Sequence, residues 1–268
     1  MHSYRLLGAQ IECSKLASLP RSAHGKQFDN GGELYCYAGV SSAIPVFMVQ
    51  DIEDNQMRLV VISDTHGLHN RIEGLPDGDV LVHAGDFMNS GYDPEDVWSF
   101  NRWLGKQSFK HIVVCAGNHD RYFENSPQEA RTLLPNAVYL ENTGVTIDNV
   151  TFWGSPYTPE FLNWAFMYPR GLGAKRYWDQ IPYGLDVLIT HGPPFGILDQ
   201  VAPGGEHLGC AELLESVEQK KPKVHLFGHI HGGAGTFERG ATRFVNAAYL
   251  NEQYKPLKPA GKIRIIDV

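Results

Sequence analysis

Cysteine is scarce in this chain of 268 residues, and the few that occur do not form a close-spaced pair. A dense disulfide framework is therefore excluded, and no cysteine-based metal motif is present. The spacing favours reduced thiols in a cytoplasmic protein, with two distant disulfides as the alternative. The four residues are Cys13, Cys36, Cys115 and Cys210.

Long apolar runs and an excess of positive charge are also missing. No segment approaches the roughly 18 apolar residues of a membrane span. The N-terminal stretch lacks the uninterrupted apolar core of a signal peptide, so we expect a cytoplasmic protein with no membrane partner. The net charge is −7 and the isoelectric point about 5.9. An acidic chain gains nothing from attraction to a phosphate backbone, which disfavours nucleic acid as a partner.

The remaining composition is that of a globular protein, with 43% hydrophobic and 20% charged residues. The pattern changes near Met57. Residues 1–57 contain hairpin-like stretches without a clear repeat and are predicted to be an N-terminal extension. Three roles stay open for it: a cap over a pocket, an arm that makes a homo-oligomer, or an additional sheet edge. Residues 58–268 are predicted to form the main domain.

Within residues 58–268, short apolar runs alternate with helical or loop segments, which is typical of a layered α/β domain. One helix is predicted after Asp93, a good N-cap followed by Pro94, and another after Cys210. Hairpins are predicted at 144–155, turning at Asp148-Asn149, and at 235–247, turning at Arg239-Gly240. Five runs read as buried strands: 58–63, 79–85, 111–117, 186–190 and 223–228.

Metal-ligand residues follow each of these five strands. Because ligands bind beyond the carboxyl ends of strands in open α/β sheets, these side chains are expected at one edge. Asp, Asn and neutral His side chains suit divalent transition ions, so the pattern predicts a two-metal site. Side chains alternate along an extended segment, so Asp64 and His66 would point to one side, and so would His229 and His231. The residues are Asp64, His66, Asp86, Asn118, His119, Asp120, His191, His229 and His231.

Each of these residues alone has a simpler explanation. Asp64 could cap a helix, Asn118 could occupy a turn, and His191 could be a satisfied loop histidine. These explanations do not predict the repeated placement at strand ends, so we favour the metal site. His229 and His231 would then bind two adjacent metals, one each.

The blocks "DTHG", "GDFMN", "GNHD", "THGPP" and "GHIHGG" resemble, in this order, those of the calcineurin-like metallophosphoesterase superfamily. The likeness covers residues 58–268. It is greatest to metallophosphoesterase-domain-containing (MPPED-type) phosphodiesterases and looser to class III cyclic-nucleotide phosphodiesterases. The resemblance implies a β-sandwich of mixed sheets flanked by helices (αββα). It also implies two divalent metal ions (Mn, Fe, Zn, Ni or Co), of which we favour Mn.

The resemblance also implies a role for each residue. A hydroxide shared by the two metals would attack phosphorus in line, with both ions stabilising the developing charge. His119 would protonate the leaving group, with Asp120 either orienting it or being a solvated loop acid. The second block of the family ends in an aspartate, and this chain has Asn89 at that position. The residue that orients His119 is therefore left open. The first metal would take Asp64, His66 and His231, the second Asn118, His191 and His229, and Asp86 would bridge them.

The substrate class is inferred from missing arginines. Protein phosphatases of this superfamily have an arginine soon after the second block and another before "GNH", where this chain has Ser90 and Ala116. Two divalent ions facing two aspartates and a hydroxide leave about one positive charge, which a monoanionic diester neutralises. A phosphodiesterase acting on small diesters, including cyclic nucleotides, is therefore favoured.

The alternatives are a monoesterase, pyrophosphatase or nuclease using the same site, and a non-catalytic binding scaffold. A scaffold would tolerate lost ligands, yet every ligand position is filled. Four aromatic residues in and after the 144–155 segment are interpreted either as packing or as a substrate wall. They are Trp153, Tyr157, Phe161 and Trp164.

Overall fold

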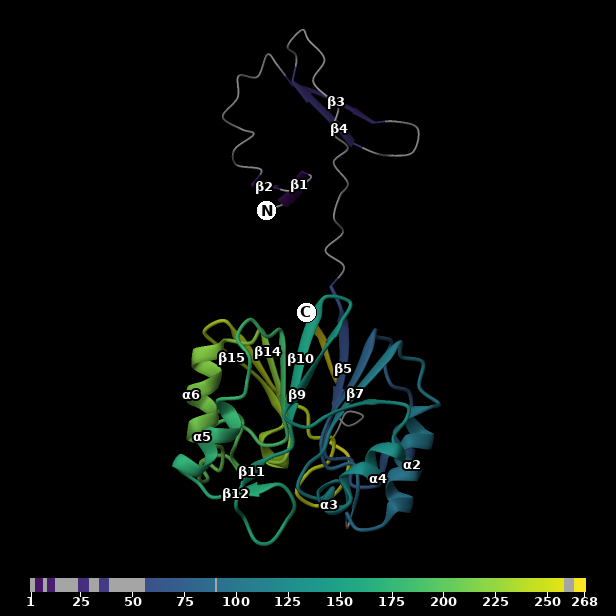
Figure 1. Ribbon diagram of the computed structural model, residues 1–268, viewed down its shortest axis with the longest axis vertical. Helices are drawn as coiled ribbons and strands as arrows, with labels where there is room; N and C mark the ends of the chain where they lie inside the picture. Colours follow the sequence, from purple (N-terminus) through teal and green to yellow (C-terminus); the bar gives the residue numbers. More distant parts are fainter. Residues whose placement is uncertain are drawn as a thin grey trace. The chain divides into compact units, whose positions relative to one another are not determined.

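The protein is described by a computed structural model that divides the chain into two units, Met1–Gln56 and Met57–Val268 (Figure 1). The described residues are 56–89, 91–257 and 263–268, together with four strands of the first unit. Those strands pair into two antiparallel hairpins. The roles considered for residues 1–57 fall mainly outside the described residues. The strands are β1 (Ser3–Leu6), β2 (Ala9–Glu12), β3 (His24–Phe28) and β4 (Leu34–Ala38).

The first sheet of the Met57–Val268 unit has five strands, in the order β17-β5-β6-β7-β8. Strands β5 to β8 are parallel, and β17 is antiparallel to β5. Continuous apolar runs form β5, β6 and β7, because both faces of the sheet are buried there. Their bounds are β5 (Arg58–Ile62), β6 (Val80–Ala84), β7 (His111–Cys115), β8 (Val138–Leu140) and β17 (Arg264–Asp267).

The second sheet has six strands, in the order β15-β16-β14-β13-β10-β9, with antiparallel edge strands and four parallel strands between them. A two-stranded ribbon, β11 (Thr158–Pro159) with β12 (Met167–Tyr168), lies between β10 and β13 in the chain. The six strands are β9 (Thr143–Ile147), β10 (Val150–Ser155), β13 (Val187–Thr190), β14 (Val224–Phe227), β15 (Gly235–Arg239) and β16 (Thr242–Asn246).

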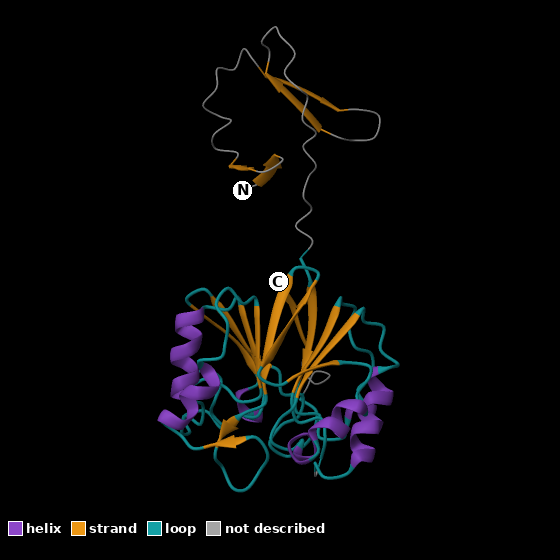
Figure 2. Ribbon diagram, in the orientation of Figure 1, coloured by secondary structure: helices purple, strands orange, loops and turns teal. Residues whose placement is uncertain are grey.

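Helices cover the outer faces of both sheets, as Figure 2 shows. One outer core joins the five-stranded sheet to α2, α3 and α4, and the other joins the six-stranded sheet to α5 and α6. The helices are η2 (His69–Arg71), α2 (Pro94–Leu104), α3 (Arg121–Asn125), α4 (Pro127–Thr132), α5 (Leu172–Trp178), α6 (Ala211–Lys220) and η3 (His231–Gly233).

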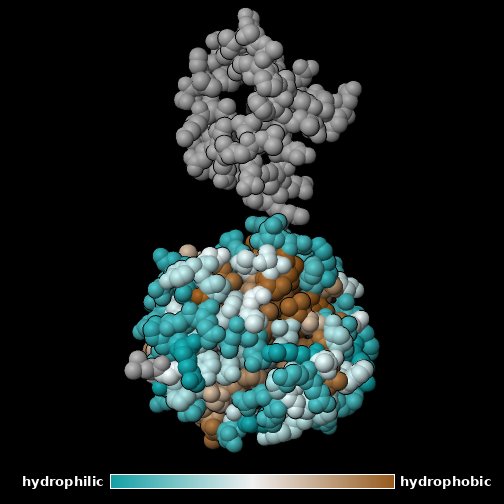
Figure 3. All heavy atoms as spheres, viewed as in Figure 1, coloured by the Kyte–Doolittle hydropathy of each residue, from teal (hydrophilic) through white to brown (hydrophobic). Residues whose placement is uncertain are grey.

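Between the sheets lies a core of aliphatic side chains, among them Val61, Val113 and Ile189, all fully buried. The arrangement is the predicted αββα sandwich. Figure 3 shows a largely hydrophilic face, with hydrophobic atoms gathered near the upper ends of the strands. Val145, Val150 and Val268 are partly buried hydrophobics packed against this core.

Most local predictions are confirmed. Asp93 caps α2 by accepting a hydrogen bond from the Glu95 amide at 2.9 Å. The 235–247 hairpin turns one residue later than predicted, because Arg239 pairs with Thr242 and leaves Gly240-Ala241 as the turn. Cys115 and Cys210 are buried free thiols. Among the described residues, every helix is too short or too polar to cross a bilayer.

Candidate metal centre

The predicted ligands converge because the loops after the strands turn sharply at the carboxyl edge of both sheets. Asp64, His66, Asp86 and His229 all have positive φ, between 42° and 66°. These loops are therefore not extended, and the predicted alternation of side chains is the wrong reason for their convergence. Two amides tie the first loop to the second: Asp64 donates to the Gly85 carbonyl and His66 to the Asp86 carbonyl, each at 2.9 Å.

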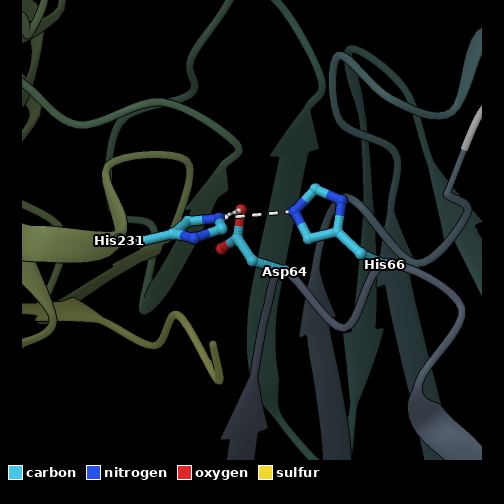
Figure 4. A group of neighbouring side chains, drawn as sticks. All are labelled: Asp64, His66 and His231. Carbon is cyan, nitrogen blue, oxygen red and sulfur yellow. Dashed lines mark hydrogen bonds and ion pairs between the residues drawn. The ribbon is translucent and has the colours of Figure 1, made fainter. Parts of the chain in front are cut away.

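Asp64, His66 and His231 form the first group of converging donors (Figure 4). Nε2 of His66 lies 3.3 Å from Nε2 of His231, which lies 3.4 Å from Oδ1 of Asp64. Asp64 is fully buried and also accepts hydrogen bonds from the His229 amide at 3.0 Å. One candidate ligand thus positions the backbone that carries another.

Asp86, His191 and His229 form the second group. Nε2 of His191 lies 3.2 Å from Oδ2 of Asp86 and 2.9 Å from Oδ1 of Asn118. Oδ2 of Asp86 also lies 3.8 Å from Nε2 of His66. Asp86 therefore lies between the two groups, where a bridging ligand would be needed.

The electrostatics of both groups favour bound cations. Burial lowers the pKa of His191, but the charge of Asp86 and a hydrogen bond to it outweigh this and raise it to about 9. Burial likewise lowers the pKa of His231, but Asp64 raises it to about 9. Burial raises the pKa of both acids, yet the neighbouring histidines bring each net below its ordinary value. A carboxylate beside each imidazole thus stabilises a positive charge.

The tautomers of two histidines show that the donors fit divalent ions. Nδ1 of His231 donates to the Asn251 carbonyl, and Nδ1 of His191 to the Ala84 carbonyl, each at 3.0 Å. Each Nε2 lone pair therefore faces the oxygens of the neighbouring acids. Lone pairs that face one another repel unless a proton or metal ion lies between them, and a backbone carbonyl behind the ring is the usual support of a metal-binding histidine.

Two glycines that directly precede candidate ligands, Gly117 and Gly228, provide a second test of this fit. A Cβ at Gly117 would clash with Oδ1 of Asp86, and one at Gly228 would clash with Oδ2 of Asp64. Glycine is required because the backbone passes directly against both carboxylates. The donors, their charges and this close backbone fit a binuclear divalent metal site.

Comparison with known proteins agrees with this geometry. Residues 57–233, two thirds of the chain, match the calcineurin-like phosphoesterase family. The chain belongs to this family. It is 38% identical over 226 residues to metallophosphoesterase domain-containing protein 1 of Homo sapiens, an alignment that covers 75% of this chain and 69% of that protein.

One further relative and one solved structure are also similar to this chain. UPF0046 protein C25E10.12 of Caenorhabditis elegans is 38% identical over 249 residues, covering 82% of this chain and 88% of its own length. The crystal structure of TT1561 of Thermus thermophilus has the same fold, with a TM-score of 0.54 at 16% identity. It covers 80% of this chain and 99% of that one. The chain is thus a metallophosphoesterase by family, and its buried Asp and His groups fit a metal site.

His119 lies at the edge of the phosphoesterase site and is half-buried. Nδ1 of its ring lies 2.8 Å from the Asn89 backbone carbonyl, so it carries hydrogen and leaves Nε2 open. The ring stacks on Trp164 with centroids 4.1 Å apart and meets His66 edge-on at 4.6 Å. A main-chain oxygen of Asn89 therefore supports the His119 ring.

Asp120 is fully buried, so the interpretation of it as a solvated loop acid is wrong. Its carboxylate accepts hydrogen bonds from the backbone amides of Asp86, Met88 and Gly117 at 2.7–2.8 Å. Asp120 therefore shapes the loops around Asp86, and the hydrogen-bond partner of the His119 ring is Asn89 instead.

The four aromatic residues in and after β10 divide between packing and the site. Trp153 is buried in the outer core under α5 and α6, and Tyr157 packs against Tyr177. Trp164 stacks on His119, and Phe161 is 65% exposed. The packing interpretation holds for the first pair. The substrate-wall interpretation remains open for the second.

Two fully buried histidines lie behind the ligand loops, one in each sheet. Nε2 of His83 lies 3.0 Å from Oγ1 of Thr65, and Nε2 of His225 lies 2.8 Å from Oγ1 of Thr190. Thr190 in turn donates to the Gly192 carbonyl. Each threonine adjoins a candidate ligand, so these pairs hold the ligand loops against a neighbouring strand. Neither pair was predicted from the sequence, because the partners are distant along the chain.

Three buried histidines, His69, His83 and His225, predict how the stability of the metal-free protein depends on pH. Burial lowers the pKa of His83 and His225 to about 3 and that of His69 to about 4. Below pH 6.5 the unfolded chain binds protons that the folded protein does not, so stability falls as pH falls. Each histidine contributes about 1.4 kcal/mol per pH unit. His191 and His231, whose pKa values are raised to about 9, oppose this only near pH 6.5, where the unfolded chain is not yet fully protonated. Asp120, whose pKa is raised by burial, opposes it by at most one proton and does not outweigh the three histidines.

The measurement is urea unfolding of the chelator-treated protein between pH 6.5 and 4.5. His225→Gln is a matched control, because glutamine can still donate to Thr190 but does not titrate. The slope of the unfolding free energy against pH should decrease by about 1.4 kcal/mol per pH unit in that variant, which is the contribution of one titrating histidine. Stability that is constant or rises toward pH 4.5 in the wild type would contradict the prediction.

Proposed function

We propose that this metallophosphoesterase is a phosphodiesterase of small molecules, cyclic nucleotides included. The proposal rests on one observation above all: two groups of buried Asp and His donors meet at Asp86, which faces both. We assign Asp64, His66 and His231 to one divalent ion, with Asn118, His191 and His229 for the other and Asp86 between them.

Two divalent ions in these positions would lower the pKa of water and stabilise negative charge on the phosphoryl group. Manganese is our favoured metal, because imidazole and carboxylate donors suit borderline ions. The chain itself positions the donors, through the Asn251 and Ala84 carbonyls and the Asp64 carboxylate. Burial of these donors excludes bulk water from the inner part of the site.

His119 is proposed as the general acid. A protonated imidazole would keep its Nδ1 hydrogen on the Asn89 carbonyl and offer the Nε2 proton to a leaving-group oxygen. The stack on Trp164 supports the ring in this orientation. Asn118 on one side and the loop shaped by Asp120 on the other fix the main chain that carries it.

The preference for diesters rests on what replaces the arginines of phosphatases. Ala116, the residue before the third block, is fully buried and offers no charge. Ser90, at the other position, lies outside the described residues. A dianionic monoester profits from a bidentate arginine, whereas a monoanionic diester needs less positive charge. We further propose a cytoplasmic protein, in agreement with the free thiols of Cys115 and Cys210.

A comparison of two nitrophenyl esters tests the substrate class. With Mn²⁺ at one pH, we expect a higher kcat/KM for bis-p-nitrophenyl phosphate than for p-nitrophenyl phosphate. A parallel preparation of Asp86→Ala measures the background from contaminating phosphatases. A monoester preference in the wild type, above that background, would replace the phosphodiesterase with a monoesterase using the same site.

A further inference from the structure

A turn near the C-terminus completes the rim of the metal centre. Residues 250–257 are closed by a bridge between Leu250 and Pro256. The turn is joined to the loop of His231 twice: His231 donates through Nδ1 to the Asn251 carbonyl at 3.0 Å, and the Gly232 amide donates to Glu252 at 2.8 Å. This turn lies beyond the residues 57–233 that match the family.

Tyr254 projects from this turn onto the site. Its φ of 55° is uncommon for a residue with a large side chain, and it costs roughly 1 kcal/mol or more. The Tyr254 amide donates to the Asn251 carbonyl at 2.8 Å, which holds that conformation. The backbone conformation thus sets the direction in which the Tyr254 side chain leaves the turn.

The ring of Tyr254 covers the first donor group on one side only. Its centroid lies 4.9 Å from that of His66 and 5.6 Å from that of His231, and both contacts are edge-on. The residue nevertheless remains 48% exposed. One part of the ring therefore packs on two candidate metal ligands while the rest is free to contact a molecule bound in front of them.

The phenol of Tyr254 is a neutral hydrogen-bond donor, because the ordinary pKa of tyrosine, about 10, lies well above neutral pH. A neutral hydrogen-bond donor complements a monoanionic phosphoryl group without adding the charge that an arginine would bring.

We propose that Tyr254 binds the substrate: its hydroxyl donates a hydrogen bond to a non-bridging phosphoryl oxygen, and its ring packs against the ester group. This inference rests on the proposed phosphodiesterase function. A second aromatic side chain, that of Trp164, is linked to Tyr254 through successive ring contacts with His66 and His119, at centroid separations of 4.9, 4.6 and 4.1 Å. An ester group bound over these rings would meet aromatic side chains.

Two variants separate the contribution of the hydroxyl from that of the ring. Tyr254→Phe removes only the donor, and Tyr254→Leu removes the ring as well. The matched control is Tyr183→Phe, which removes the hydroxyl of a tyrosine that is 65% exposed. Tyr183 lies before β13, at the end of that strand away from the metal centre. Its ring lies under the Lys220 ammonium group.

Calorimetric binding of dimethyl phosphate and diphenyl phosphate to the Mn²⁺-loaded proteins is the primary readout. We expect Tyr254→Phe to weaken both about tenfold, since a hydrogen bond to a charged group is lost. Tyr254→Leu should weaken diphenyl phosphate by a further ~threefold, because the aromatic contact is lost as well. KM for bis-p-nitrophenyl phosphate should rise in parallel, with little change in kcat. Manganese content and the Tyr183→Phe control should match the wild type.

Unchanged binding of both diesters in both Tyr254 variants would overturn the inference. Loss of manganese in Tyr254→Phe would also overturn it, because the residue would then support the metal ligands instead of the substrate. The binding readout does not require turnover. A wild type that binds diesters through Tyr254 but fails to hydrolyse them leaves the inference standing and rejects the proposed function alone.

Discussion

Replacing Asp86 by alanine should reduce kcat/KM on bis-p-nitrophenyl phosphate by about 10³-fold or more. Asp86 faces His191 at 3.2 Å and His66 at 3.8 Å, so its removal affects both donor groups. A metal ion supplies several kcal/mol of transition-state stabilisation, and roughly 4 kcal/mol corresponds to a factor of 10³. The measurement is steady-state kinetics with elemental analysis of the same samples.

The control for Asp86 is Asp186→Asn. Asp186 lies before β13, at the end of the strand away from the site, where it accepts hydrogen bonds from Thr151. That variant loses a carboxylate but should keep wild-type activity and metal content. An Asp86→Ala protein that retains two ions and most of its activity would show that the bridging role is misassigned.

Replacing His119 by alanine should give a loss that depends on the leaving group. A ribose alkoxide is a poor leaving group and needs a proton in the transition state, so hydrolysis of a cyclic nucleotide should slow by about 10²-fold or more. Nitrophenolate leaves readily, so the loss on bis-p-nitrophenyl phosphate should be smaller. Metal content should remain close to that of the wild type.

His111→Ala is the control for His119, because His111 begins β7, at the end of the strand away from the site. Equal losses on both substrates would argue that His119 positions phosphate or water instead of donating a proton. Because His119 also lies within reach of His66 and Asp86 as a third donor group, lost metal would identify it as a ligand.

Much of the fold could be predicted because the parallel strands are buried on both faces. Such strands read as continuous apolar runs, and five of them were placed within one or two residues of their observed bounds. The order of strands within the sheets could not be read in the same way. Strands β10 and β13, for example, pair across more than thirty residues of loop and helix, through backbone groups that every residue has.

The candidate site was predictable wherever side-chain identity carries the chemistry. His191 and Asp86 stand directly after strands, and a His or Asp in that position is conspicuous. The supports were missed because they act through the main chain: the Asn89 carbonyl behind His119 and the Asn251 carbonyl behind His231 leave no mark on residue type. Tyr254 was missed because neither a block nor a strand end contains it.

The count of metal ions in reconstituted protein tests the central claim most directly. Protein treated with chelator, incubated with excess Mn²⁺ and freed of unbound ions should contain two ions per chain by elemental analysis. The buried groups at Asp64, His66 and His231 and at Asp86, His191 and His229 each account for one. A count of one ion or fewer per chain, at saturating Mn²⁺, would contradict the two-metal account.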